Sequence, residues 1–177
     1  TVSLTHSGTS NYDLMVFELD TASGTARSGF FLELDGRQYA RDMVINNGQL
    51  YIAAITNDSI SAGTDTVNVG TGYKSFLVTC DLQGNMSWVA SLYRTMSGAS
   101  GTEQELKLGP AGNVYYFQEF SGTIPVQDTS ITSLGSRDLL LLKIKSNGQL
   151  DYFKHMGSSN FDYLGGLHPL SNGRVIV

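Results

Sequence analysis

The chain has 177 residues, of which 41% are hydrophobic and 15% are charged, and its formal net charge is −5 at pH 7. This hydrophobic share is normal for a globular protein and argues against disorder along the whole chain. Helical surfaces need many Glu, Lys and Arg residues, so the low charged share favours β structure. No segment concentrates Lys or Arg, which argues against nucleic acid as a partner.

Three further features are the apolar runs, the single cysteine and the start of the chain. No apolar run approaches the roughly 20 residues of a membrane span, so we expect no membrane insertion. The sole cysteine, Cys80, lies in the apolar segment Phe76–Cys80 and is expected to be a small buried hydrophobe. The start, Thr1-Val2-Ser3-Leu4, has no initiator Met or signal peptide, which favours processing or an excerpt from a longer polypeptide.

Similar segments recur along the chain about every 61–64 residues, a spacing set by turn-like glycines. Apolar segments of one kind precede the first turn of each unit: Asp13–Phe17, Lys74–Val78 and Asp138–Leu142. Segments of a second kind contain a Gly-x-x-apolar turn: Asn47–Tyr51, Ala111–Tyr115 and Asn172–Ile176. Three copies of two aligned features predict an internal repeat.

Each unit is expected to contain four short strands. In the second unit these are Phe76–Leu82, Ser87–Tyr93, Glu105–Leu108 and Asn113–Phe120, and in the third Leu139–Lys145, Leu150–His155, Tyr163–Leu170 and Arg174–Val177. Asn147-Gly148 and Asn172-Gly173 suit type I′ hairpin turns. Leu139–Leu142 lacks alternation, which predicts that both faces of this strand are covered. We expect no helix.

Four antiparallel strands per repeat are typical of a β-propeller blade. The predicted fold is all-β, with three blades at about 1–60, 61–121 and 122–177. The long polar segments Asn57–Gly72 and Ser121–Arg137 are expected to connect the units. A closed propeller has about 4–8 blades. We therefore expect part of a larger propeller, whose other blades come from the same longer chain or from other copies.

The repeat resembles the β-propeller repeats of secreted bacterial proteins, the SBBP repeat family. The resemblance is carried by Gly135-Ser136-Arg137-Asp138, Lys143, Asn147-Gly148 and Gly112-Asn113-Val114-Tyr115, and Trp88 takes the family's tryptophan position once. Lys74 replaces the aspartate in the second copy. The resemblance spans essentially the whole chain. It implies a secreted or cell-surface location and no particular reaction.

No catalytic site is predicted, because His6, His155 and His168 share no local context with a nucleophile. Asp13, Asp138 and Asp162 are expected to make turn hydrogen bonds. Calcium is the metal that the oxygen-rich loop residues suit best, but their spacing matches no known calcium loop, so we predict no cofactor or metal site. These loop residues are Asn57, Asp58, Ser59, Asp65 and Asp128.

Glycan recognition needs an aromatic face beside planar polar groups. Tyr12 and Tyr73 stand just before equivalent strands, and Arg137 takes this position in the third copy. These three residues are the candidate ligand-binding residues.

The expected function is a non-enzymatic extracellular or cell-surface module that binds protein or glycan, or spaces other domains. One alternative is a structural subunit of an extracellular fibre or secretion-associated complex, in which edge strands pair between chains. The other is a propeller hydrolase or lyase with acidic residues in the central channel, at least one with a raised pKa.

Overall fold

The computed structural model describes residues 2–5, 13–32, 37–57, 59–62, 65–67, 74–88 and 103–177. These residues form antiparallel strands, which confirms the expected all-β fold. The one helical element described among them is a 3₁₀ turn at Pro110–Gly112. No helix in these ranges is long and apolar enough to span a membrane.

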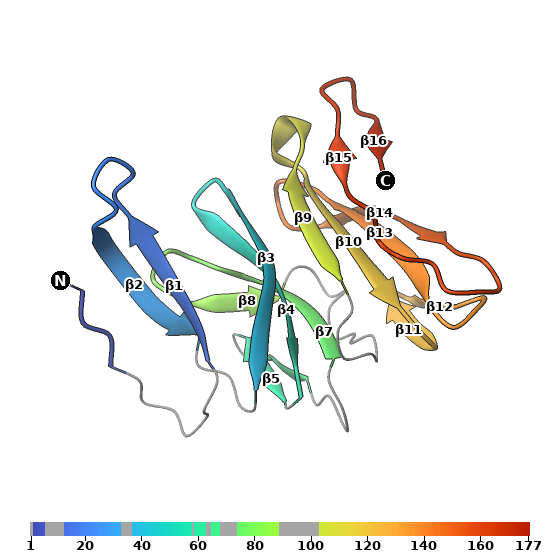
Figure 1. Cartoon of the computed structure of the whole chain (residues 1–177), viewed down its shortest axis with the longest axis horizontal. Helices are drawn as coiled ribbons and strands as arrows, with labels where there is room; N and C mark the ends of the chain where they lie inside the picture. The colour runs from blue at the N-terminus through green and yellow to red at the C-terminus, as the bar shows by residue number, and fades with distance from the viewer. Residues whose placement is uncertain are drawn as a thin grey trace.

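Two four-stranded sheets form the centre of the molecule (Figure 1). The first sheet has the order β3 (Gln38–Asn46), β4 (Gln49–Thr56), β7 (Lys74–Cys80) and β8 (Met86–Trp88). The second sheet has the order β9 (Gln104–Leu108), β10 (Val114–Phe120), β13 (Asp138–Ile144) and β14 (Leu150–Met156).

A two-stranded hairpin flanks the sheets at each end. The N-terminal hairpin consists of β1 (Leu14–Leu19) and β2 (Ala26–Leu32). The C-terminal hairpin consists of β15 (His168–Pro169) and β16 (Val175–Ile176). The two hairpins lie at opposite ends of the molecule (Figure 1).

The four elements pack in series, because three hydrophobic cores join them. One core lies between the N-terminal hairpin and the first sheet, one between the two sheets, and one between the second sheet and the C-terminal segment. In β4, Tyr51 and Ala53 face the second sheet, whereas Ile52 faces the N-terminal hairpin. Leu140 and Leu141 likewise enter different cores, so the prediction that both faces of this strand are covered is confirmed.

Each long connection joins two strands of the same sheet. The sequence had predicted instead that these connections link one unit to the next. Each joins the second and third strands of a sheet and forms its own hairpin. The hairpins are β5 (Ile60–Ala62) with β6 (Asp65–Val67), and β11 (Thr123–Val126) with β12 (Thr129–Thr132). Ile124 and Val126 are buried in the core between the sheets. This apolar contribution keeps the second hairpin against its own sheet.

Each four-stranded sheet combines strands from two adjacent sequence repeats. β3 and β4 fall within residues 1–60, whereas β7 and β8 fall within 61–121. The second sheet shows the same offset. Sequence similarity reveals the period of a repeat, but strand pairing decides where each structural unit begins.

The predicted turn type is wrong at two hairpins. A type I′ turn needs positive φ at both central residues, and among the described residues Asn47-Gly48 has φ values of 50° and 77°. At Asn147-Gly148 and Asn172-Gly173 only the glycine has positive φ. Lys145 N–H donates to Gln149 O at 2.8 Å, and Gly148 N–H donates to Lys145 O at 2.9 Å. The loop is thus longer than two residues and needs one left-handed position, which glycine fills.

Replacing Gly148 by Ala should destabilise the protein by about 1–2 kcal/mol, because φ is 83° there and a Cβ atom resists the left-handed region. The site is otherwise open, with nothing within 4 Å of the added Cβ. Gly165→Ala is the matched control, since Gly165 is equally open and lies outside the left-handed region. Chemical denaturation measures both variants, and equal midpoints would contradict the turn geometry.

The Cys80 thiol is fully buried in the core beside the N-terminal hairpin, as expected. Burial, reinforced by the neighbouring Asp81 charge, raises the pKa of the thiol to about 11. Because the thiolate is the reactive form, we expect Cys80 to resist iodoacetamide at pH 8 in the folded chain and to react after unfolding. Mass spectrometry of the intact chain follows the modification. Rapid labelling of the folded chain at this pH would show that Cys80 is accessible.

Candidate functional site

One rim of the second sheet brings together residues that are distant in the sequence. Glu119 stands at the end of β10, and Arg137 immediately precedes β13. The segment after β14 crosses this rim: Phe161 forms a parallel bridge with Arg137, and Asp162 N–H donates to Arg137 O at 2.9 Å. A surface segment is thereby attached to the buried end of β10.

The buried Glu119 side chain bonds two segments of this rim. Its side chain is 1% exposed, and its two oxygens have different partners. Oε2 accepts from Arg137 Nη1 at 2.8 Å, and Oε1 accepts from Leu164 N–H at 3.0 Å. A buried carboxylate is stable only when it is paired and hydrogen-bonded, so Glu119 favours the arrangement in which both Arg137 and Leu164 lie against it.

Two aromatic rings lie on the surface above this ion pair. Phe161 and Tyr163 are stacked, with centroids 6.2 Å apart and planes 13° apart, and they are 55% and 67% exposed. The Arg137 guanidinium lies 6.0 Å from the Tyr163 ring centroid. We call Arg137, Phe161 and Tyr163 the aromatic–arginine surface. It presents flat apolar rings beside a planar hydrogen-bond donor.

The loop that carries the rings is held by local hydrogen bonds. The Asp162 carboxylate accepts from Ser158 N–H at 2.7 Å and from the Ser158 hydroxyl. This supports the expected turn role of Asp162.

The strand predicted at Tyr163–Leu170 is described as a strand only at His168–Pro169. Leu164 N–H donates to the Glu119 side chain, so the pairing between β15 and β16 does not extend back to Tyr163.

Asp138 and His155 form a second polar pair behind this rim. The fully buried Asp138 accepts from Leu134 N–H at 2.9 Å and contacts His155 Nε2 at 2.5 Å through Oδ2. Burial raises the pKa of the carboxyl, but the hydrogen bonds from Leu134 and His155 lower it more, and the net pKa lies below the usual value. Gly157 leaves room for the carboxyl, because a Cβ there would lie 2.2 Å from Asp138 Cγ. This geometry supports the turn role expected for Asp138.

Of the three candidate ligand-binding residues, Arg137 is the one that lies among the described residues. Tyr12, Tyr73 and His6 lie outside the described residues, as does Asp58 of the calcium candidates. Arg137 is described, and its guanidinium pairs with Glu119 and lies beside Tyr163. Asn57 Oδ1 accepts from Arg37 N–H at 2.8 Å. Within the described ranges, no three acidic, His or Cys side chains gather as metal ligands.

Three residues of the rim were not predicted from the sequence: Glu119, Phe161 and Tyr163. A signal for the rings was present, because aromatic residues two positions apart in an extended segment share one face. Glu119 had no such signal, since its partners are supplied by residues 18 and 45 positions away.

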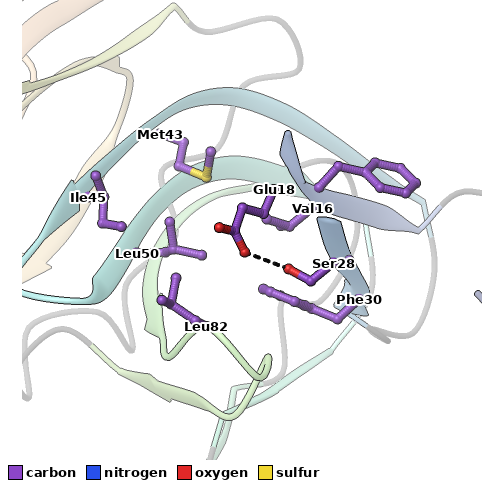
Figure 2. A pocket seen from close by; sticks show the side chains of 10 residues that line it. Val16, Glu18, Ser28, Phe30, Met43, Ile45, Leu50 and Leu82 are labelled. Carbon is purple, nitrogen blue, oxygen red and sulfur yellow. Dashed lines mark hydrogen bonds between the residues drawn. The ribbon is translucent and has the colours of Figure 1, made fainter. Parts of the chain in front are cut away.

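An apolar groove lies at the other end of the molecule, between the N-terminal hairpin and the first sheet (Figure 2). Its volume is about 270 Å³. Val16, Phe30 and Leu50 line it, and Glu18 points into it while accepting a hydrogen bond from the Ser28 hydroxyl at 2.8 Å. One carboxylate among apolar side chains offers no catalytic pair, so the groove is suited to covering by apolar groups.

Four described carboxyl groups have a clearly shifted pKa, and each is lowered: Asp20, Asp81, Asp138 and Asp151. Hydrogen bonds in turns or to Lys and Arg dominate the lowering. Lowered pKa values suit structural hydrogen bonding. A general acid at neutral pH needs the opposite shift.

A comparison with family models finds no match for the chain, and a comparison with curated proteins finds none either. The resemblance to secreted bacterial propeller repeats therefore stays a prediction.

Asp138→Asn should destabilise the protein by about 1.5–3 kcal/mol at pH 7, because the buried hydrogen bonds lose their charged acceptor. The folded pKa lies below the unfolded value of 3.8, so the carboxylate's contribution is complete above that pH and is lost as the pH falls through the folded pKa. The difference from wild type should thus be constant near neutral pH and shrink as the pH falls below 3.8, measured by chemical denaturation. Asp128→Asn, at an exposed turn residue, is the control. A difference independent of pH would contradict the assigned role of the Asp138 carboxylate.

Proposed function

We propose that this chain is a β-propeller portion that acts as a non-enzymatic extracellular or cell-surface binding module. Its ligand is a carbohydrate, which stacks on the aromatic–arginine surface. The observation that carries the proposal is the exposed, parallel ring pair of Phe161 and Tyr163, held in place through the buried Glu119.

The serial packing supports the propeller arrangement. Each four-stranded antiparallel sheet covers its neighbour face to face, and connecting loops collect at the rims, as blades do around an axis. The N-terminal hairpin, the two sheets and the C-terminal hairpin fan out in this order (Figure 1). The resemblance of the repeat to propeller repeats of secreted bacterial proteins supports the extracellular location.

The chemistry of the rim supports carbohydrate as the ligand class. A sugar ring has an apolar face of C–H groups that packs on an aromatic plane, and hydroxyl groups that need planar donors and acceptors. Phe161 and Tyr163 supply the plane, while Arg137 and the Tyr163 hydroxyl supply polar groups. Preorganisation by Glu119 lowers the ordering cost of binding.

A glycan microarray probed with the 177-residue chain tests this function. We expect binding to at least one glycan class, and we expect Phe161→Ala and Tyr163→Ala each to weaken that binding by about tenfold, because one half of the stacking surface is removed. Titration calorimetry with the glycan identified gives the affinities.

Tyr39→Ala is the matched control, since Tyr39 is an exposed aromatic residue on β3, away from the rim. It should leave the affinity unchanged. Binding that survives both rim substitutions would place the glycan elsewhere, and failure to bind any glycan would favour a protein ligand.

A further inference from the structure

Each terminal hairpin presents a strand edge. In the described residues, β1 pairs with β2 alone, and β16 pairs with β15 alone. A strand edge presents backbone N–H and C=O groups that can pair with another strand. The two edges lie at opposite ends of the stack (Figure 1), so one copy cannot join them to each other.

The N-terminal hairpin has the pairing of the second half of a sheet. The β1–β2 register shifts between Glu18 and Leu19, and the β13–β14 register shifts at the equivalent repeat position, between Lys143 and Ile144. In the second sheet, β13 pairs with β14 on one side and with β10 on the other. Among the described residues, no strand therefore stands beside β1 as β10 stands beside β13.

The C-terminal hairpin has the pairing of the first half of a sheet. Pro169 pairs with Val175 as Leu108 pairs with Val114, and the loops between them have equal length. Leu170 N–H donates to Arg174 O at 2.8 Å, matching Gly109 N–H to Asn113 O at 2.8 Å. By this equivalence, β16 corresponds to β10, the strand that stands beside β13.

The outward face of β1 is exposed where its counterparts are buried. Its residues Met15, Phe17 and Leu19 are 57%, 45% and 55% exposed, whereas Phe76, Val78 and Cys80 of β7 are 1%, 0% and 0% exposed and Leu140, Leu142 and Ile144 of β13 are 1%, 0% and 0% exposed. The repeat therefore places apolar side chains on a face that the described residues leave uncovered.

The groove beside β1 also contains apolar side chains that the described residues leave uncovered (Figure 2). Met43 on β3 is 48% exposed, but its repeat counterpart Leu106 on β9 is 1% exposed, because Leu106 packs in a core that includes Tyr51. The counterpart of Tyr51 in the C-terminal hairpin is Ile176, which is itself 55% exposed. Ile176 thus has the position that would cover Met43.

We propose that β1 is the docking edge for β16 of a second copy of this chain. Repeating the pairs Leu50 with Cys80 and Val114 with Ile144 places Val175 opposite Leu19 and Ile176 opposite Glu18. The two hairpins then form one four-stranded sheet, and Ile176 enters the groove against Met43. This inference rests on the proposed propeller arrangement.

The contact closes on itself with two copies. Among the described residues, each copy holds two four-stranded sheets and a two-stranded hairpin at each end. Two copies of the 177-residue chain therefore make six four-stranded sheets, which lies in the range of about 4–8 for closed propellers. A head-to-tail contact forms a ring when its rotation closes and an open filament when it does not. The expected product is a dimer.

Cross-linking tests the register. Glu18→Cys and Ile176→Cys are made in separate chains, mixed and oxidised, because directly opposed residues of antiparallel strands bring their Cβ atoms within disulfide range. The buried Cys80 remains in both. We expect a disulfide between the two variants. Glu18→Cys mixed with Leu108→Cys, at an equally exposed strand residue, is the matched control and should not cross-link. Equal cross-linking in both mixtures would overturn the register.

Sedimentation velocity tests the assembly. We expect the 177-residue chain to form a concentration-dependent species of twice its 19.1 kDa mass. Ile176→Asp should weaken this association by about tenfold or more, since a second carboxylate enters the groove directly opposite Glu18, and Leu108→Asp should leave it unchanged. A monomer at every concentration, or open-ended polymers, would overturn the proposal. Glycan binding at the Phe161–Tyr163 rim by a wild-type chain that stays monomeric would show that only the docking proposal has failed and that the binding function stands.

Discussion

Burial of both faces of each four-stranded sheet is the constraint on which the structure depends. Strands β4, β7, β10 and β13 carry apolar side chains on both faces, and these side chains enter two different cores. Such a sheet cannot face water on either side without exposing a large apolar area. It is stable only between two neighbours. Serial packing follows from this requirement, and so does the exposure of apolar residues wherever the series stops.

Buried carboxylates accept hydrogen bonds from backbone N–H groups at the rim of the stack. Loops that leave a buried sheet carry backbone N–H groups that need acceptors. Glu119 accepts from Leu164 N–H, and Asp138 accepts from Leu134 N–H, each while paired with a basic side chain. The same bonds that satisfy the backbone also order the surface segments. The exposed rings of Phe161 and Tyr163 thereby gain a defined orientation without being buried themselves.

The proposed binding surface and the proposed docking edge lie in different parts of the stack. The aromatic–arginine surface depends on contacts within the second sheet and the segment after it, whereas the β1 edge and its groove depend on the N-terminal hairpin and β3. The proposed binding and the proposed assembly therefore draw on different residues. A module of this kind can join to other sheets through its ends while its rim loops remain available to a ligand.

Local patterns in the sequence determined most strands of the two four-stranded sheets, the β class, the period of the repeat, the burial of Cys80 and the two covered faces of Leu139–Leu142, because hydrophobic patterning and turn glycines act over a few residues. Tertiary structure alone decided which strands share a sheet, that each connection forms a hairpin between two strands of one sheet, and that Glu119 bonds Arg137 and the backbone of Leu164. These features depend on pairing between segments far apart in the chain. The free energy of such pairing comes from surfaces that become complementary only after the sheets have stacked. The residues of one short segment therefore do not predict it.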